Sequence, residues 1–218
     1  MKTVLFDLDG TLLDTAPDLA FALNQLRAER QLPTLAFDKI RPLVSHGGAA
    51  LIRGGLDMNE TDPEFEPCRQ RLLDIYQDNL INKTRLFQDM DKVLNALENA
   101  QIKWGVVTNK PARFTLPIMR GLQLDSRASS IVCGDTLNRN KPHPDPILLA
   151  CQQSDSTHTE CVYIGDAQRD IEAGRNANMP TLVALFGYLD KDDQPDTWQA
   201  DGMLNTPLDI LDWLQIKA

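Results

Sequence analysis

The sequence predicts an α/β fold, with a doubly wound parallel-sheet core and an all-helical domain inserted after the first strand. Short apolar segments recur along the chain, and most are continuous rather than alternating, as in strands that are buried on both faces. Helical segments separate the later ones, and such alternation is typical of right-handed βαβ units. The strand-like segments are residues 4–6, 104–107, 131–133, 161–164 and 182–185.

The helices predicted for the core are recognised by apolar periodicity or by an initial proline. Residues 89–100 place Met90, Val93 and Leu97 on one stripe, as an amphipathic helix does. Pro111 stands at the start of another segment, in a position that proline favours within a first helical turn. The predicted core helices span residues 89–100, 111–122, 146–153 and 168–178.

Residues 15–83 depart from this alternation, because they contain no convincing strand-like segment. Thr15 and Asp18 resemble a capping box, with Asp in place of Glu or Gln. We interpret 15–83 as a helical domain, and 1–14 with 84–218 as the α/β core. One long crossover is the alternative, although a crossover needs far fewer residues. The helices expected in this domain run from the capping box to about residue 30, then over 37–44, 48–54 and 65–80.

Composition excludes several classes of protein. A net charge of −9 over 218 residues argues against a nucleic-acid partner, which would require a basic face. No segment reaches the roughly 18 apolar residues of a membrane span, and the N-terminal apolar run is too short for a signal peptide. We therefore expect a cytoplasmic protein with no membrane partner; it would be a monomer or a homodimer, and the sequence does not distinguish between these states. The four cysteines form no C-x-x-C pair and are expected to be reduced and buried.

Polar side chains follow the predicted strands at the points where the strands end. The carboxyl ends of parallel strands form one edge of a sheet, where ligands bind, so these side chains are expected to converge. Four carboxylates in one cleft would raise one another's pKa unless a cation neutralised them. Oxygen ligands without His or Cys indicate a hard ion, most often Mg²⁺. The side chains are Asp7, Asp9, Thr11, Thr108, Asn109, Lys110, Asp135, Lys141, Asp166 and Asp170.

Asp7 and Asp9 lie two residues apart, and alternation along an extended strand would direct both to the same side. One carboxylate can then attack a substrate while the other transfers protons, provided that their environments separate their pKa values. Gly10 would let the backbone turn away close to a phosphate group. Phosphoryl transfer depends mainly on positioning and charge neutralisation, which suits this set of residues.

These motifs together resemble the haloacid dehalogenase superfamily. The resemblance rests on F-D-x-D-G-T at residues 6–11, a strand ending in Thr108, Lys141 in a loop, and G-D-x-x-x-D at 165–170. It implies a Rossmann-like core, and the helical insertion resembles the cap of the phosphoglycolate phosphatase-like group. The stretches WGVVTNKPARF and GDAQRDIEAGR are similar to bacterial N-acetylmuramic acid 6-phosphate phosphatases.

The resemblance implies a catalytic role for each matching residue. Asp7 would be the nucleophile that forms an aspartyl-phosphate. Asp9 would protonate the leaving alcohol and then activate water. Thr108 and the Asn109 amide would hold the phosphoryl group, and Lys141 would bind that group and offset the charge of Asp7.

The resemblance also implies a Mg²⁺ site. Asp7 and Asp166 would bind the ion directly, and Asp9 would contribute its backbone carbonyl. Asp170 would act through water or brace the site. Ala167 stands where relatives often have a small hydroxyl residue, so one hydrogen bond near the metal is expected to be absent.

The helical domain contains Gly47 and Gly48 before a predicted helix, followed by Arg53. Adjacent glycines let backbone amides approach an anion at a helix start, so this loop resembles the part of the cap that contacts the leaving group. A plain turn is the alternative for the glycines. Arg53 would contact a substrate carboxylate or form a surface ion pair.

The resulting hypothesis is a Mg²⁺-dependent phosphomonoester phosphatase that acts on a small phosphorylated sugar acid. N-acetylmuramic acid 6-phosphate is the first candidate substrate and 2-phosphoglycolate the second. A phosphosugar mutase of the same fold remains an alternative, and a non-enzymatic binding module is the alternative from another class. A nucleotide-binding domain is disfavoured because the chain has neither G-x-G-x-x-G nor G-x-x-x-x-G-K-[ST].

Overall fold

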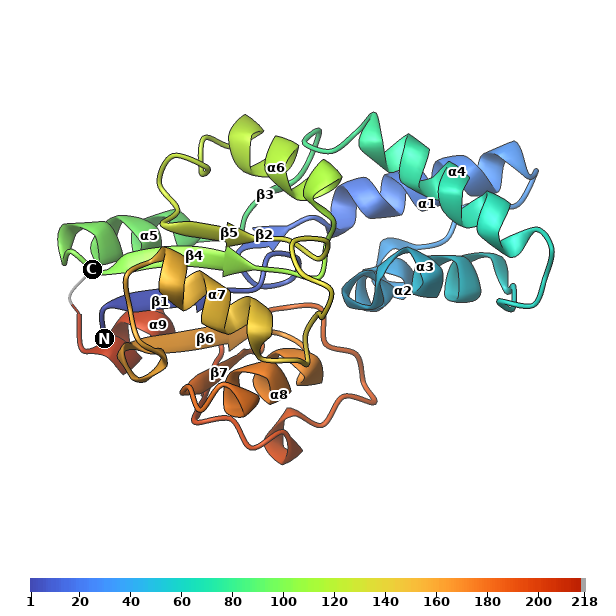
Figure 1. Cartoon of the computed structure of the whole chain (residues 1–218). Helices are drawn as coiled ribbons and strands as arrows, with labels where there is room; N and C mark the ends of the chain where they lie inside the picture. The colour runs from blue at the N-terminus through green and yellow to red at the C-terminus, as the bar shows by residue number, and fades with distance from the viewer. Residues whose placement is uncertain (217–218) are drawn as a thin grey trace. The chain divides into compact units, whose positions relative to one another are not determined.

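The structure is a computed structural model that describes residues 1–216. The chain divides into two compact units, one made of Met1–Leu13 and the chain from Leu86 onward, the other of Asp14–Arg85. The sequence-based prediction draws the limits of the helical domain at residues 15 and 83. The two units are described separately below (Figure 1).

The first unit contains a six-stranded sheet with the strand order β5-β4-β1-β6-β7-β8. Every neighbouring pair is parallel. All five predicted strands are present, with ends shifted by one residue at most. Strand β8 was not predicted, because its Gly-Met-Leu sequence is not a continuous apolar segment of the kind that marked the other strands. The strands are β1 Thr3–Phe6, β4 Lys103–Val107, β5 Ser130–Val132, β6 Cys161–Gly165, β7 Thr181–Ala184 and β8 Gly202–Leu204.

Helices cover both faces of this sheet, so the doubly wound prediction is confirmed. Figure 1 shows α7 and α8 against one face, with α5 and α9 against the other. Strands and helices share an apolar cluster in which Leu5 and Tyr163 of the sheet pack with Ile147 of α7 and Ala173 of α8. The helices are α5 Met90–Asn99, α6 Ala112–Gly121, α7 Asp145–Gln153, α8 Gln168–Asn176 and α9 Asp209–Leu214.

The second unit is helical, as predicted, and α1 packs against both α3 and α4. The predicted helix over residues 37–44 is instead a short α-helix followed by a 3₁₀ helix. Pro42 accounts for the change, because it has no backbone N–H with which to continue the α-helical hydrogen bonds. The elements are α1 Ala16–Glu29, α2 Phe37–Ile40, the 3₁₀ helix Arg41–His46, α3 Gly47–Leu56 and α4 Phe65–Gln77.

Two short strands, β2 (Leu13–Asp14) and β3 (Arg85–Leu86), pair where the chain passes from one unit to the other and back. Next to this ribbon, the predicted capping box at Thr15 is wrong, because the Thr15 side chain makes no cap hydrogen bond. The carboxylate of Asp18 is buried and instead accepts hydrogen bonds from the backbone N–H groups of Lys83 and Thr84 and from the Thr84 hydroxyl. Asp18 therefore fastens the start of the helical unit to its end.

Two expectations drawn from composition can be compared with the structure. All four cysteines are buried and free of disulfide bonds, as predicted. Among residues 1–216, none of the helices has the length and apolar character that a membrane crossing requires.

Substituting Asp18→Ala should lower the free energy of unfolding by about 2–3 kcal/mol, because buried N–H and O–H donors would lose a charged acceptor. Urea unfolding followed by circular dichroism measures the change. Asp38→Ala in the same unit is the matched control, since its exposed carboxylate accepts a hydrogen bond from the amide of its neighbour Lys39, and its effect should stay within about 0.5 kcal/mol. Equal effects of the two substitutions would contradict the anchoring role of Asp18.

Candidate active site

The candidate site lies at the carboxyl edge of the sheet, beyond the ends of its central strands. Strand β1 pairs with β4 on one side and with β6 on the other, and Phe6 is level with Val106 and Ile164. The chain continues from these positions into Asp7, Thr108 and Asp166. Sheet register therefore brings together three of the residues predicted from the sequence.

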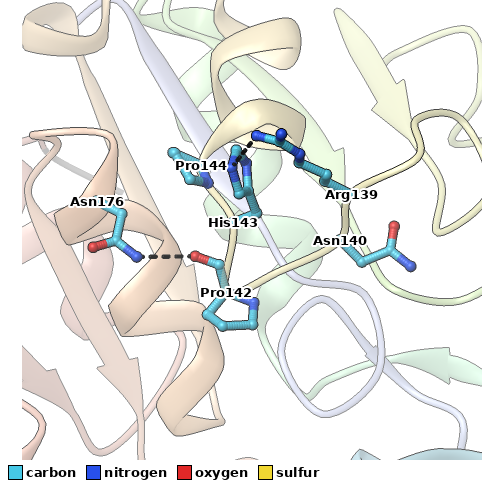
Figure 2. Close-up of a pocket in the computed structure, with 6 residues that line it drawn as sticks. All are labelled: Arg139, Asn140, Pro142, His143, Pro144 and Asn176. Atoms are coloured by element: carbon cyan, nitrogen blue, oxygen red, sulfur yellow. Dashed lines mark hydrogen bonds between the residues drawn. The ribbon is translucent and has the colours of Figure 1, made fainter.

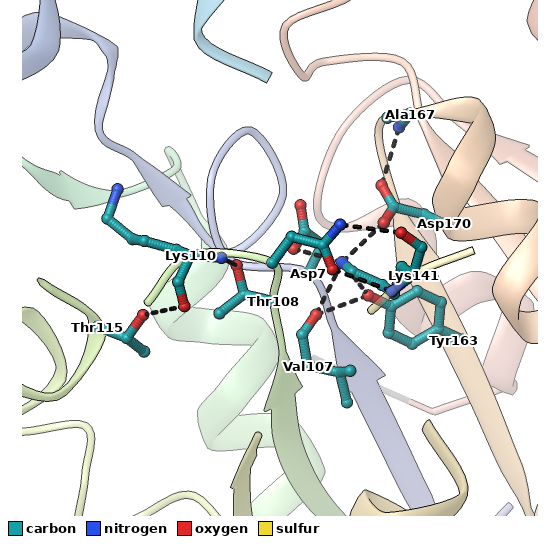
Figure 3. A network of polar contacts seen from close by, with 10 residues as sticks. Asp7, Val107, Thr108, Lys110, Thr115, Lys141, Tyr163, Ala167 and Asp170 are labelled. Atoms are coloured by element: carbon teal, nitrogen blue, oxygen red, sulfur yellow. Dashed lines mark hydrogen bonds and ion pairs between the residues drawn. The ribbon is translucent and has the colours of Figure 1, made fainter. Parts of the chain in front are cut away.

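Lys141 lies at the centre of the polar network in Figure 3, and its side chain is 1% exposed. Its Nζ lies 2.7 Å from Oδ1 of Asp7 and 2.7 Å from Oδ1 of Asp170. It also donates to the hydroxyl of Tyr163 at 2.7 Å and to the carbonyl of Val107 at 2.9 Å. A buried ammonium requires such compensation, because desolvating a charge without partners is costly.

For both Asp7 and Lys141, burial and the nearby opposite charges shift the pKa in opposite directions. Burial is the main reason that the pKa of Asp7 rises to about 6, with Lys141 opposing the rise and Asp170 adding to it. Burial alone would lower the pKa of Lys141, but the carboxylates of Asp170 and Asp7 outweigh it and raise that pKa. Lys141 is thus a permanent cation, and Asp7 is an acid whose anionic form benefits from any further positive charge.

Tyr163 was missed in the sequence analysis, where it belongs to a predicted strand and reads as a core residue. Its hydroxyl accepts from Lys141 and donates to the Val107 carbonyl at 2.8 Å. Burial raises the pKa of Tyr163 well above its ordinary value, so the hydroxyl remains protonated and available as a donor. Tyr163 therefore fixes the position of the Lys141 ammonium from the β6 side.

Thr108 and Asn109 follow β4 next to this network. The Thr108 hydroxyl accepts from the backbone N–H of Lys110 at 3.1 Å. The Asn109 side chain donates to the Lys141 carbonyl at 3.0 Å and accepts from the Lys141 N–H at 3.1 Å. The sequence analysis assigned the Asn109 amide to the phosphoryl group, whereas the structure shows the Asn109 side chain holding the loop that carries Lys141.

Asp7, Asp166 and Asp170 form a group of buried carboxylates. Each offers an oxygen, and these oxygens lie within 4.8 Å of one another. Oδ2 of Asp166 accepts from the Tyr188 N–H at 2.8 Å, and Oδ2 of Asp170 accepts from the Ala167 N–H at 3.0 Å. This oxygen-only set has the donor chemistry of a site for a hard divalent cation.

Two glycines pack against Asp166 and leave no room for a side chain. Gly10 has a positive φ of 87°, and an added Cβ would lie 2.1 Å from Oδ2 of Asp166. A Cβ on Gly187 would lie 2.3 Å from the Cβ of Asp166 and 2.5 Å from the Gly10 carbonyl oxygen. Gly187 was missed because it is distant in sequence from every motif, and only the fold brings it to Asp166.

Asp9 does not belong to the carboxylate group formed by Asp7, Asp166 and Asp170. Its Oδ1 lies 2.8 Å from Nζ of Lys110, and both side chains are mostly buried. The sequence analysis included Lys110 among the polar residues that follow this strand, two residues after Thr108, but gave it no role. The two aspartates that follow β1 are therefore paired with different lysines.

The remaining candidates, Gly47, Gly48 and Arg53, lie in the helical unit. Gly47 stands at the start of α3 with a positive φ of 75°, and a Cβ added there would have no described atom within 4 Å. Arg53 forms an ion pair with Glu60 within the same unit, and its side chain is about half exposed. The local structure thus includes the surface ion pair that the sequence analysis held as one alternative for Arg53.

A shallow pocket of about 450 Å³ lies beside the loop that carries Lys141 (Figure 2). The Asn176 side chain of α8 donates to the Pro142 carbonyl at 3.1 Å, and Arg139 contacts the His143 ring at 2.8 Å. None of the clustered carboxylates lines it, so it is separate from the carboxylate group. Its lining residues are Arg139, Asn140, Pro142, His143, Pro144 and Asn176.

The chain is similar in sequence and fold to several known proteins. Over 98% of its length, the chain is 41% identical to an N-acetylmuramic acid 6-phosphate phosphatase of Pseudomonas aeruginosa, covering 95% of that protein. It is also 41% identical to a phosphoglycolate phosphatase of Xanthomonas campestris, with 94% and 93% of the two chains covered. A crystal structure from Haemophilus somnus, described as a predicted phosphoglycolate phosphatase, superposes with a TM-score of 0.86 at 28% identity, over 99% and 98% of the chains.

A family model described as haloacid dehalogenase-like hydrolase matches residues 4–184, which include Asp7, Thr108, Lys141 and both aspartates at 166 and 170. That match covers most of the chain and agrees with the fold and with the relatives. The chain belongs to the haloacid dehalogenase-like hydrolases.

Proposed function

We propose that the protein is a Mg²⁺-dependent phosphomonoester phosphatase that acts through an aspartyl-phosphate. The observation that carries the proposal is the position of Asp7, at a strand end, in contact with Lys141 and beside Asp166 and Asp170. A carboxylate in this position can act as a nucleophile, because the Lys141 ammonium beside it offsets the negative charge of an incoming phosphate group. The names of the relatives described above, which are phosphatases, support the same reaction class.

In the first step, a carboxylate oxygen of Asp7 attacks phosphorus, and the bond from phosphorus to the substrate oxygen breaks. Asp9 gives its proton to the departing oxygen, which leaves as an alcohol. In the second step, Asp9 takes a proton from water while that water attacks phosphorus. Inorganic phosphate leaves and the Asp7 carboxylate is regenerated.

The phosphoryl group is held by residues from three segments of the chain. Lys141 neutralises part of its charge, while the Thr108 hydroxyl and the Asn109 backbone N–H donate hydrogen bonds to its oxygens. Gly10 has a positive φ and no side chain, so the backbone at this position can turn away and leave space for the phosphoryl group. Thr108 and Asn109 directly follow β4, and Lys141 is held by Asp7 and Asp170, so the phosphoryl group can be aligned with Asp7.

The donor set fits Mg²⁺, because the three buried carboxylates supply oxygen ligands and the backbone carbonyl of Asp9 can add another. Asp7 and Asp166 would hold the ion directly, and Asp170 would do so through water or would brace the site. When bound, Mg²⁺ neutralises charge on the transferring phosphoryl group. The Tyr188 N–H keeps Asp166 oriented, as partners of metal ligands commonly do.

We further propose that Asp14–Arg85 is a cap domain that recognises the leaving group, with Gly47 and Gly48 as an anion-binding helix start. Arg53 would contact the substrate only if its ion pair with Glu60 were replaced by one with a substrate carboxylate. The substrate would be a small phosphorylated metabolite of the cytoplasm, and N-acetylmuramic acid 6-phosphate ranks first because two of the most similar relatives carry that name. Phosphoglycolate ranks second on the names of further relatives.

Asp7→Asn should reduce phosphate release by at least about 10³-fold, because an amide is a poor nucleophile and the covalent step is lost. Release of inorganic phosphate measures the rate, and circular dichroism measures folding. Asp91→Asn, an exposed change in the first turn of α5, is the matched control and should retain full activity. A folded Asp7→Asn protein with more than a tenth of the normal rate would refute the aspartyl-phosphate mechanism.

Side-by-side kinetics test the ranking of substrates. We expect kcat/KM for N-acetylmuramic acid 6-phosphate to exceed that for 2-phosphoglycolate by at least roughly tenfold, because a site shaped for a larger leaving group loses contacts with a smaller one. A preference for phosphoglycolate would reverse the ranking and leave the phosphatase mechanism intact.

Gly187→Ala should weaken Mg²⁺ binding by roughly 10–100-fold, because the new methyl group would displace Asp166 and the Gly10 carbonyl. Isothermal titration calorimetry with MgCl₂ measures the affinity directly. Gly202→Ala is the control, since its Cβ would meet only the tip of the Leu182 side chain and the Trp213 ring. Unchanged Mg²⁺ affinity in a folded Gly187→Ala protein would argue against Asp166 as a ligand.

A further inference from the structure

We propose that Lys110 is the positioning residue for Asp9, and that it holds the Asp9 carboxyl group where it meets the leaving-group oxygen. This inference rests on the proposed function, in which Asp9 transfers the proton. Nζ of Lys110 lies 2.8 Å from Oδ1 of Asp9. The side chains are only 9% and 15% exposed, unlike those of an ordinary surface ion pair.

The backbone of Lys110 is fixed by three hydrogen bonds. Its N–H donates to the Thr108 hydroxyl at 3.1 Å. Its carbonyl accepts from the Gly134 N–H at 2.9 Å and from the Thr115 hydroxyl at 3.2 Å. The long side chain therefore starts from a rigid turn between β4 and α6, which limits the positions that its ammonium can reach.

The two lysines of the site contact different aspartates. Lys141 contacts Asp7 and Asp170, whereas Lys110 contacts Asp9. Figure 3 shows the Lys110 side chain extending away from the network around Lys141. Asp7 and Asp9 are only two residues apart, so a single shared cation would draw both carboxylates together. A separate cation for Asp9 keeps it out of the carboxylate group and at its own place in the site.

Displacement of Asp9 would affect one chemical event above all. When the bond between phosphorus and the substrate oxygen breaks and the Asp7–phosphorus bond forms, the Asp9 proton moves to that oxygen. An alkyl ester depends on this transfer, because an alkoxide is a poor leaving group. p-Nitrophenolate leaves without a proton. A misplaced Asp9 therefore slows alkyl esters far more than p-nitrophenyl phosphate.

The test compares Lys110→Met and Lys110→Arg with the wild type on N-acetylmuramic acid 6-phosphate, 2-phosphoglycolate and p-nitrophenyl phosphate. For the better alkyl ester, Lys110→Met should lower kcat roughly 10- to 100-fold and change KM less than about threefold. The rate on p-nitrophenyl phosphate should fall less than about threefold. Lys110→Arg should recover most of the lost kcat, because it restores a cation that can reach Asp9.

Lys92→Met is the matched control, since Lys92 forms an exposed ion pair with Asp89 in the same unit. Lys92→Met should leave the rates on the alkyl ester and on p-nitrophenyl phosphate unchanged. A double substitution, Asp9→Asn with Lys110→Met, should be no slower than Asp9→Asn alone, because Lys110 acts through Asp9.

Three results would overturn the inference. These are an unchanged rate in Lys110→Met, an equal loss on alkyl and p-nitrophenyl esters, or additive losses in the double variant. Each can occur with an active wild type and leaves the proposed phosphatase function standing. A wild type that releases no phosphate from any of the three esters would overturn the proposed function, and this inference with it.

Discussion

The contact of the Lys141 ammonium with Asp7 and Asp170 is the interaction on which the rest of the site depends. It joins the end of β1, the first turn of α8 and the loop before α7, while Tyr163 and the Val107 carbonyl complete its surroundings. A lone buried carboxylate or ammonium would be strongly destabilising, so each of these charges requires the others. The sheet edge, the lysine loop and the carboxylate group therefore form one electrostatic unit.

This unit also explains how an acidic chain can bind a phosphate ester. The protein carries a net charge of −9, yet buried cations lie at the centre of its site. Exposed surface charges are screened by water and salt, whereas charges in a poorly hydrated site act strongly over a few ångströms. In the proposed mechanism, the local charge of Lys141 at the phosphoryl group therefore matters more than the overall charge of the chain.

Much of the fold and part of the site could be predicted from the sequence, because both depend on local signals. Continuous apolar segments located five strands, and polar residues directly after them located Asp7, Thr108 and Asp166. Contacts between distant segments could not be predicted. Lys110 is one of several polar residues after a strand and Tyr163 looks like a core residue, and only the fold shows that they contact Asp9 and Lys141. Asp18 matched a local capping pattern, but donors 65 and 66 residues away bind it instead.

The hydrogen bonds accepted by Asp18 bear on how the helical insertion can change in evolution. Because Asp18 holds the Lys83 and Thr84 amides, the helical insertion leaves and rejoins the sheet-bearing unit at neighbouring points. The cost of closing a loop grows only slowly with its length, so an insertion with fastened ends can lengthen, shorten or be exchanged at little expense to the sheet. If residues 14–85 recognise the leaving group, as proposed above, new substrate preferences can arise in this unit while the residues that carry the proposed phosphoryl transfer stay the same.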